Sequence, residues 1–256
     1  MSKNTLRQLA NALSVALALT VNILANALPL NGQTTGAISD RFPVLFTPAG
    51  YVFSIWGLIY IGLLAFAIYQ LLPSQAANPR LERLGWWFAL SCFFNCAWIF
   101  LWQFNFFLLT LPAMLGLLLC LLVIYLRLHI GSDPVTRREL WLVNLPFSVY
   151  LGWISVALIA NFAVVLNYTG WNATDLTAVI LTIIVLLVGI GLGVAMTLLR
   201  QEIAYPLVLV WAYAGIWVKQ TLVSPVVGMT ALLGAGALLM AMGIYRLRRL
   251  RAKEEG

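Results

Sequence analysis

The chain has 256 residues, of which 62% are hydrophobic and only 9% are charged, and its mean hydropathy is +0.96. Soluble domains typically carry about 25% charged residues, so this composition excludes an ordinary soluble protein and predicts an integral membrane protein. The net charge of +7 would suggest nucleic acid as the partner of a soluble protein. Here the basic residues lie in short connections and at the C-terminus, so we expect membrane lipid, and no nucleic acid, as their partner.

Eight apolar segments reach the length of roughly 17 to 25 residues that crosses a hydrocarbon layer of ~30 Å. They lie near residues 8–28, 48–72, 86–105, 107–127, 140–166, 176–199, 203–219 and 223–245. The predicted fold is therefore an all-α polytopic membrane bundle with about eight transmembrane helices.

The first apolar segment has two interpretations. Lys3 and Arg7 precede it and Ala25-Asn26-Ala27 ends it, which fits a secretory signal with a small-residue cleavage site. Two asparagines inside the segment, Asn22 and Asn26, favour a retained helix instead.

The distribution of Lys and Arg predicts the orientation. Alternating eight spans from a cytoplasmic N-terminus places on one side Lys3, Arg7, Arg80, Arg83, Arg127, Arg137, Arg138, Arg200, Arg246, Arg248, Arg249, Arg251 and Lys253. Only Arg41 and Lys219 fall on the other side. This asymmetry predicts a multi-pass protein of the cell membrane with both termini in the cytoplasm.

Charged and metal-binding chemistry finds little support in the sequence. The first six spans and the eighth contain no Asp, Glu, Lys or Arg deep within the membrane, which counts against proton-coupled pumps and voltage sensors. The chain has one histidine, His129, at the end of a span, and its three cysteines, Cys92, Cys96 and Cys120, lie in apolar runs typical of core residues. We therefore assign no catalytic residue, no metal ligand and no required cofactor.

Aromatic and amide side chains are the remaining candidates for a site. Two groups follow the i, i+3, i+7 spacing of one helix face, and they are Phe53, Trp56 and Tyr60 in the second segment and Asn95, Trp98 and Trp102 in the third. The fifth segment contains Trp153, Ala157 and Asn161. Tryptophans on three spans with an amide among them predict a pocket for a planar, mostly apolar ligand with one polar edge.

Three of these segments resemble the TspO family (translocator protein, tryptophan-rich sensory protein). Residues 47–60 read Thr-Pro-Ala-Gly-Tyr-Val-Phe-Ser-Ile-Trp-Gly-Leu-Ile-Tyr and are similar to the family's Pro-Pro-Gly-Trp-Val-Phe segment, which leads into a Trp and a Tyr. Asn95 and Trp98 resemble its Asn-x-x-Trp element, and residues 146–161 resemble its Pro-Tyr-Leu-x-Trp, Phe-Ala and Leu-Asn segment. The resemblance covers about residues 8–167 and favours a retained first helix.

The resemblance implies a five-helix membrane bundle over residues 1–173, to which residues 174–256 add three transmembrane helices and a basic cytoplasmic tail. It further implies that the protein binds a tetrapyrrole such as porphyrin or haem, or a sterol-like lipid, with a sensory, regulatory or transport role. The expected ligand-binding residues are Tyr51, Trp56, Tyr60, Asn95, Trp98, Trp153, Ala157 and Asn161.

Two other functions stay open. A secondary transporter of a small apolar or zwitterionic solute would use the three additional helices to complete a path. A porphyrin-degrading enzyme would use tryptophan as its electron donor, and we favour it less than binding. Gly189 and Gly193 form a small-xxx-small face that suits close helix packing within the chain or between two copies in a homodimer.

Overall fold

The computed structural model describes residues 3–171 and 174–254, and its regular structure in these ranges is helical. Eight long helices occur there: α1 Lys3–Ala27, α3 Ile55–Leu71, α5 Trp87–Gln103, α6 Phe107–Arg127, α8 Leu145–Tyr168, α9 Leu176–Leu199, α10 Ala204–Gln220 and α11 Pro225–Glu254. They coincide with the eight predicted segments, so the all-α polytopic fold is confirmed.

The eight helices fall into two groups by the length of the continuous helical stretch that contains each of them, and α3, with 17 residues of its own, belongs to the 22-residue stretch Gly50–Leu71. Within the described ranges, six helical stretches are long and apolar enough to cross a membrane, and they contain α1, α3, α6, α8, α9 and α11. The helices α5 and α10 have 17 residues each, which corresponds to about 26 Å. Both fit a hydrocarbon layer only if it is slightly thin or if the adjoining turns contribute.

Short helical elements complete the connections. They are η1 Leu30–Gly32, α2 Thr35–Asp40 and η2 Gly50–Ser54 before α3, then η3 Pro73–Gln75 and α4 Pro79–Glu82 before α5, and finally α7 Arg137–Glu139 with the π-helical turn η4 Leu140–Asn144 before α8. The Thr136 hydroxyl and the Glu139 carboxylate form a capping box that starts α7. Pro146 lacks a backbone donor, and the π-turn just before it accommodates this proline in one continuous stretch from α7 to α8.

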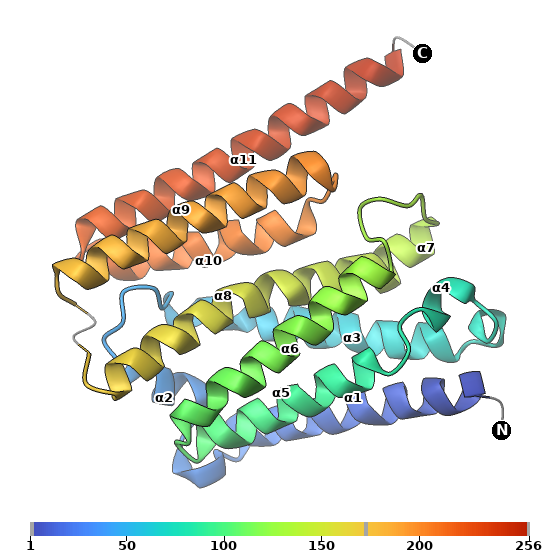
Figure 1. The fold of residues 1–256 in the computed structure, drawn as a ribbon, viewed down its shortest axis with the longest axis horizontal. Coiled ribbons are helices and arrows are strands. Elements are labelled where there is room, and N and C mark those ends of the chain that lie inside the picture. The colour runs from blue at the N-terminus through green and yellow to red at the C-terminus, as the bar shows by residue number, and fades with distance from the viewer. Residues whose placement is uncertain (1–2, 172–173, 255–256) are drawn as a thin grey trace.

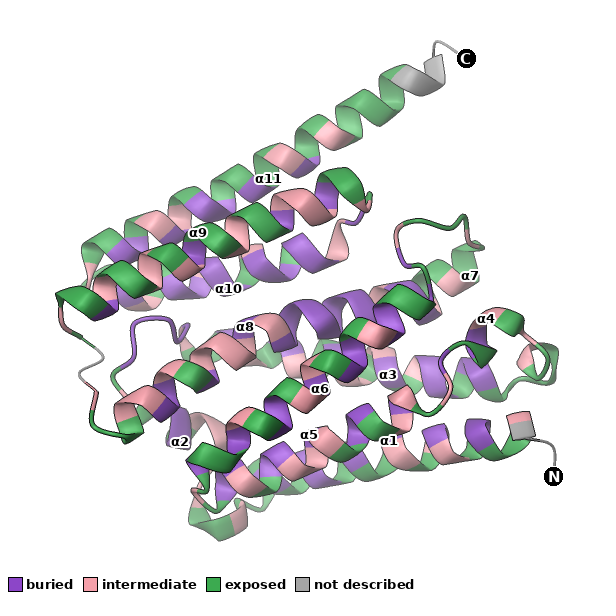
Figure 2. Ribbon diagram, viewed as in Figure 1, coloured by how far each residue is buried: buried purple, intermediate pink, exposed green. Residues whose placement is uncertain are grey.

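The long helices form two packed groups (Figure 1). The first group contains α1, α3, α5, α6 and α8, and the second contains α9, α10 and α11. The helix α8 lies between α3, α6 and α10, and α10 is the helix through which the second group packs on the first. Figure 2 shows buried residues concentrated on α8 and α10, whereas α9 and α11 present many exposed, mostly apolar residues of the kind that lipid covers.

Gly189 and Gly193 pack inside the chain. A Cβ atom at Gly189 would lie 2.2 Å from the Tyr213 hydroxyl of α10, and one at Gly193 would lie 2.5 Å from Leu238 Cδ2 of α11. The small-xxx-small face of α9 therefore allows α10 and α11 to approach, which is one of the two uses expected from the sequence. A homodimer stays a prediction.

The two ends of the bundle differ in charge. The start of α1, the α4 and α7 segments and the end of α11 lie toward one end of the molecule (Figure 1). The segments at this end carry the thirteen Lys and Arg residues that the sequence places on one side of the membrane. We call this end of the molecule the basic end. The connection from α1 to α3, the turn from α5 to α6 and the C-terminus of α10 lie at the opposite end.

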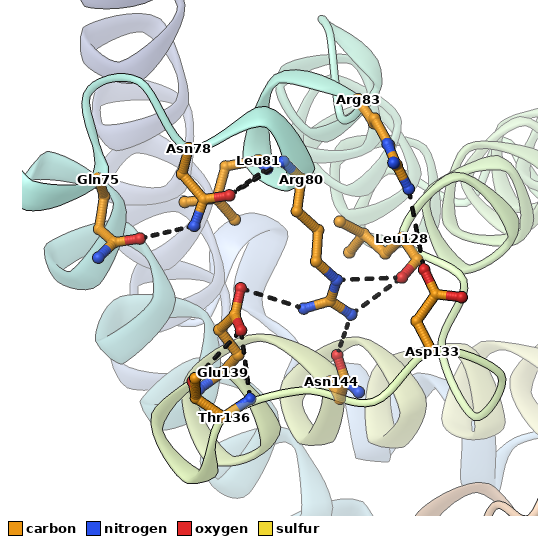
Figure 3. Close-up of polar contacts among 10 residues, drawn as sticks. All are labelled: Gln75, Asn78, Arg80, Leu81, Arg83, Leu128, Asp133, Thr136, Glu139 and Asn144. Carbon is orange, nitrogen blue, oxygen red and sulfur yellow. Dashed lines mark hydrogen bonds and ion pairs between the residues drawn. The ribbon is translucent and has the colours of Figure 1, made fainter.

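Arg80 of α4 organises the basic end (Figure 3). Its guanidinium donates to the Leu128 carbonyl at 3.2 and 2.9 Å and to Asn144 Oδ1 at 2.5 Å, and it lies 3.7 Å from Glu139 Oε1. Burial lowers the pKa of Arg80 from its ordinary value, and the Glu139 charge opposes that shift. Because Leu128 ends α6 and Asn144 precedes α8, this one side chain connects α4, α6 and α8.

The two groups of helices meet closely where α10 crosses η2. The Ala49 N–H donates to the Gly215 carbonyl at 3.1 Å, and Trp211 Nε1 donates to the Val52 carbonyl at 3.0 Å. A Cβ atom at Gly215 would lie only 2.1 Å from Val52 Cγ2 and 3.0 Å from Pro48 Cβ. Glycine at position 215 is therefore required by the contact between α10 and the segment that begins α3.

This contact predicts opposite effects for two glycine substitutions. Gly215→Ala should lower the thermal unfolding midpoint, because the new methyl group overlaps Val52 and Pro48. A Cβ atom at Gly236 of α11 would meet no atom within 4 Å, so Gly236→Ala should stabilise the helix by up to about 1 kcal/mol. Thermal unfolding of both variants in one detergent measures the difference. A Gly215→Ala variant as stable as Gly236→Ala would show that α10 does not approach η2 this closely.

Candidate ligand-binding site

An aromatic pocket of about 40 Å³ lies between α2, α3, α5 and α8, toward the end of the bundle that is opposite the basic end. We use the name aromatic pocket for the cavity lined by Thr35, Ser39, Thr47, Pro48, Phe53, Trp56, Trp98, Trp102, Trp153, Val156, Ala157, Ala160, Asn161 and Val164. A neighbouring cavity of about 150 Å³ shares Thr35, Phe53 and Trp56 with it and extends toward Asn22 and Asn26 of α1. The two cavities therefore form adjoining compartments.

Helical spacing brings the rings of the pocket together. Trp56 and Tyr60 are four residues apart on α3, and their rings stack with centroids 5.3 Å apart and 16° between their planes. Trp153 of α8 meets the edges of Phe53 at 5.7 Å and of Trp56 at 6.1 Å. Such pairs contribute about 0.5 to 1.5 kcal/mol each beyond area burial. The rings are thus fixed in place before any ligand binds.

The structure brings five of the eight predicted residues together. Trp56, Trp98, Trp153, Ala157 and Asn161 line the aromatic pocket. Tyr60 lines the neighbouring cavity. Phe53 and Trp102, which belong to the same aromatic stripes, also line the pocket although they were not among the eight. Their i, i+3, i+7 spacing was the signal that could have included them.

Tyr51 lies outside both cavities. Its side chain is 47% exposed, and its ring meets the edge of Trp211 on α10 at 5.3 Å. Tyr51 and Phe53 both belong to η2, but Tyr51 is five residues before Trp56 and lies on the face that packs against α10.

The Asn95 side chain forms hydrogen bonds with two other helices. It is 1% exposed, accepts a hydrogen bond from Asn22 Nδ2 at 2.7 Å and donates to the Tyr150 hydroxyl at 3.0 Å. It lines neither cavity. Asn95 was expected to supply the ligand's polar contact, but its geometry links α1, α5 and α8 instead.

Asn161 lines the pocket with its hydrogen bonds already formed. Its Oδ1 accepts from Trp98 Nε1 at 2.8 Å, and its Nδ2 donates to the Thr110 hydroxyl at 2.8 Å. These bonds join α5, α6 and α8. Asn161 therefore orients the Trp98 ring, which forms part of the pocket wall.

Three other polar atoms at the pocket have no hydrogen-bond partner among the described residues. They are the Thr35 and Thr47 hydroxyls and Trp153 Nε1, and all three residues line the pocket. Thr47 is 1% and Trp153 is 2% exposed. A buried polar group without a partner costs about 1 to 3 kcal/mol, and a ligand with a polar edge would remove that cost. Thr47 was not predicted, although it stands directly before Pro48 in the 47–60 motif.

The connection from α1 to α3 covers the pocket. Within it, the Thr35 carbonyl accepts from Trp102 Nε1 at 3.2 Å, and Asn31 Nδ2 donates to the Gln103 carbonyl at 3.0 Å. The Arg41 guanidinium donates to Asn105. All three bonds attach this connection to the last turns of α5 and to the turn that follows it.

These features define the class of the protein as a polytopic α-helical membrane protein with an aromatic pocket enclosed by its helices. The chain belongs to the TspO family, because the family model described as TSPO-like protein matches residues 8–244. That match extends past residue 167, where the resemblance of the sequence motifs ended, and takes in α9, α10 and much of α11. Searches of curated proteins and of solved structures returned no match.

The unpartnered hydroxyl of Thr47 predicts an unusual response to substitution. Thr47→Val removes a buried polar group of nearly the same shape, so the thermal unfolding midpoint should stay the same or rise. Thr110→Val is the matched control, since it removes the partner of Asn161 Nδ2 and should cost about 1 to 3 kcal/mol. Thermal unfolding of both variants without added ligand gives the comparison. If Thr47→Val is as costly as Thr110→Val, the Thr47 hydroxyl is already satisfied and is not a free ligand contact.

Proposed function

We propose that this protein binds a planar, mostly apolar ligand with one polar edge in the aromatic pocket, and that binding serves a sensory, regulatory or transport role. The observation that carries the proposal is the convergence of tryptophans from α3, α5 and α8 on one cavity in which Trp153 Nε1 and the Thr47 hydroxyl lack partners. Ring faces supply stacking, and these two polar atoms supply directed hydrogen bonds.

The ligand class that we propose is a tetrapyrrole such as porphyrin or haem, or a sterol-like lipid. Sites for ligands of this size typically enclose about 300 to 1,000 Å³, whereas the two compartments here measure about 40 and 150 Å³. Binding therefore requires the pocket to open. The segment from η1 to α2 is the part that would move, because it contributes Thr35 and Ser39 to the wall, whereas Pro48 and Ala49 pack against Gly215 of α10.

Trp153 provides the test of this site. Trp153→Leu removes a ring face and the Nε1 donor, so it should weaken a planar ligand about tenfold. Trp141→Leu is the control, because Trp141 is 64% exposed and lies on η4 at the basic end. Titration of the purified protein with protoporphyrin, haem and a sterol, followed by tryptophan quenching, measures both affinities.

Two further readouts make this test decisive. Thr47→Val should weaken the ligand without lowering the unfolding midpoint, which separates loss of contact from loss of fold. Equal losses for the Trp153 and Trp141 variants, or no loss for Trp153→Leu and Thr47→Val, would contradict the proposal. A porphyrin absorbance that decays under light or oxidant would show degradation in place of simple binding.

We infer that the basic end faces the cytoplasm, because it collects thirteen Lys and Arg residues while only Arg41 and Lys219 lie at the opposite end. Ser132→Cys at the basic end and Thr169→Cys at the opposite end are both exposed positions. A membrane-impermeant thiol reagent added to intact cells should modify the Thr169→Cys variant and leave the Ser132→Cys variant unmodified until the membrane is opened. The reverse labelling would invert the orientation.

A further inference from the structure

A second and much larger cavity lies at the basic end, far from the aromatic pocket. It encloses about 790 Å³ between the start of α8, the turn from α9 to α10 and the last turns of α11. The residues that matter for its chemistry are Leu140, Trp141, Glu202, Leu207, Arg246 and Arg249. We call this cavity the basic-end groove.

The length of α11 places the groove at the membrane surface. With 30 residues, α11 is about 45 Å long, whereas the hydrocarbon layer measures about 30 Å. If the apolar part of α11 spans the membrane, the turns from Arg246 onward lie at the level of the lipid headgroups. Trp141 lines the groove and is largely exposed, as expected for a tryptophan at the interface.

Two arginines of the groove have no acidic partner. Arg246 and Arg249 are three residues apart, so they share one face of α11, and both line the groove. Neither forms an ion pair with any side chain that the structure describes. The groove therefore presents two uncompensated positive charges on one wall.

The acidic residues of the groove are already occupied. Asp133 lies 3.9 Å from both Arg83 and His129. The Glu202 carboxylate accepts from the Ile203 and Ala204 N–H groups that begin α10 and from the Ser148 hydroxyl. Neither carboxylate forms an ion pair with Arg246 or Arg249, because Asp133 pairs with other side chains and Glu202 is held at the start of α10.

Part of the remaining wall is apolar and exposed, beside the polar residues Ser132, Asn144 and Gln201. Leu140 and Trp141 of η4 and Leu207 of α10 are exposed although they line the groove. A site with two cations beside exposed apolar side chains at headgroup depth is complementary to an amphiphile that carries a phosphate. Since α11 packs on α9 and α10, such a molecule would also fill the space between α11 and the start of α8.

We propose that the basic-end groove binds one anionic phospholipid, whose phosphate contacts Arg246 and Arg249 and whose acyl chains lie along Leu140, Trp141 and Leu207. This site is independent of the aromatic pocket and of the ligand proposed for it. The lipid connects the end of α11 with the start of α8 and so joins the two groups of helices at the basic end.

The test compares two charge-matched double variants. Arg246→Gln with Arg249→Gln removes the groove arginines, and Arg248→Gln with Arg251→Gln removes two others from the same helix that do not line the groove. Each protein is reconstituted with phosphatidylglycerol and phosphatidylcholine and then purified in detergent, and native mass spectrometry counts the retained lipids. The groove variant should retain phosphatidylglycerol about tenfold less than the parent, and the control should change by less than about twofold.

Additional measurements separate the lipid from other anions and from misfolding. Leu207→Trp fills the apolar wall without changing charge, and it should also lower phosphatidylglycerol retention. Phosphatidylglycerol should raise the unfolding midpoint of the parent and of the control, and not that of the groove variant. Equal losses in both double variants would show diffuse surface attraction and overturn the proposal, as would unchanged retention in the groove variant. Displacement of the lipid by an equal concentration of glycerol phosphate would assign the groove to a free phosphate ester and overturn the lipid as its occupant.

Discussion

The hydrogen bonds that the amide side chains of Asn22, Asn95 and Asn161 form inside the first group of helices are the constraint on which the aromatic pocket depends. Hydrocarbon offers no hydrogen-bond partner, so each buried amide must be satisfied by another helix. Two layers meet this requirement: Asn22, Asn95 and Tyr150 join α1, α5 and α8, while Trp98, Asn161 and Thr110 join α5, α8 and α6. Each layer forms at only one rotation and one depth of its helices. The rings of Trp98 and Trp153 face one cavity because these layers fix α5 and α8, and Trp56 of α3 joins them through its ring contact with Trp153.

The second group of helices is part of this arrangement and not an appendage. At Gly152 a Cβ atom would lie 3.1 Å from Val208 Cβ, and at Gly215 it would overlap Val52, so glycines on both sides allow α10 to lie directly on α8 and on η2. The segment η2 leads into α3, whose Trp56 forms a wall of the aromatic pocket. An opening that moved η2 would break the bonds from Ala49 to Gly215 and from Trp211 to Val52. The helix α10 therefore fixes the position of this wall.

The sequence predicts most of the fold because length and hydropathy alone decide which segments can span a membrane. It also predicts the tryptophans of the pocket wall, since helical spacing aligns Trp56, Trp98 and Trp153 with their neighbours. It does not predict the partner of Asn95, because spacing along one helix contains no information on the rotation of α1 and α8 against it. Thr47 gives no periodic signal, as it precedes the first turn of η2. The fold and the rings were thus accessible from the sequence, whereas the polar contacts depended on packing between helices.

The contacts at the two ends of the bundle differ in strength. Arg80 and Glu139 are nearly buried, and removing one member of a buried charged pair costs about 3 to 5 kcal/mol, so α4, α6 and α8 are firmly joined at the basic end. At the opposite end, Lys219 and Asp40 form a more exposed pair at 3.6 Å, and such pairs contribute only about 0 to 1 kcal/mol. The polar contacts of the connection that covers the aromatic pocket are this pair and a few single hydrogen bonds, and its Ile38, Val44 and Phe46 are buried in the hydrophobic core. These polar contacts are weaker than the buried ion pair at the basic end, so the opening proposed above would begin at the opposite end, with the amide layers and the Arg80 contacts intact.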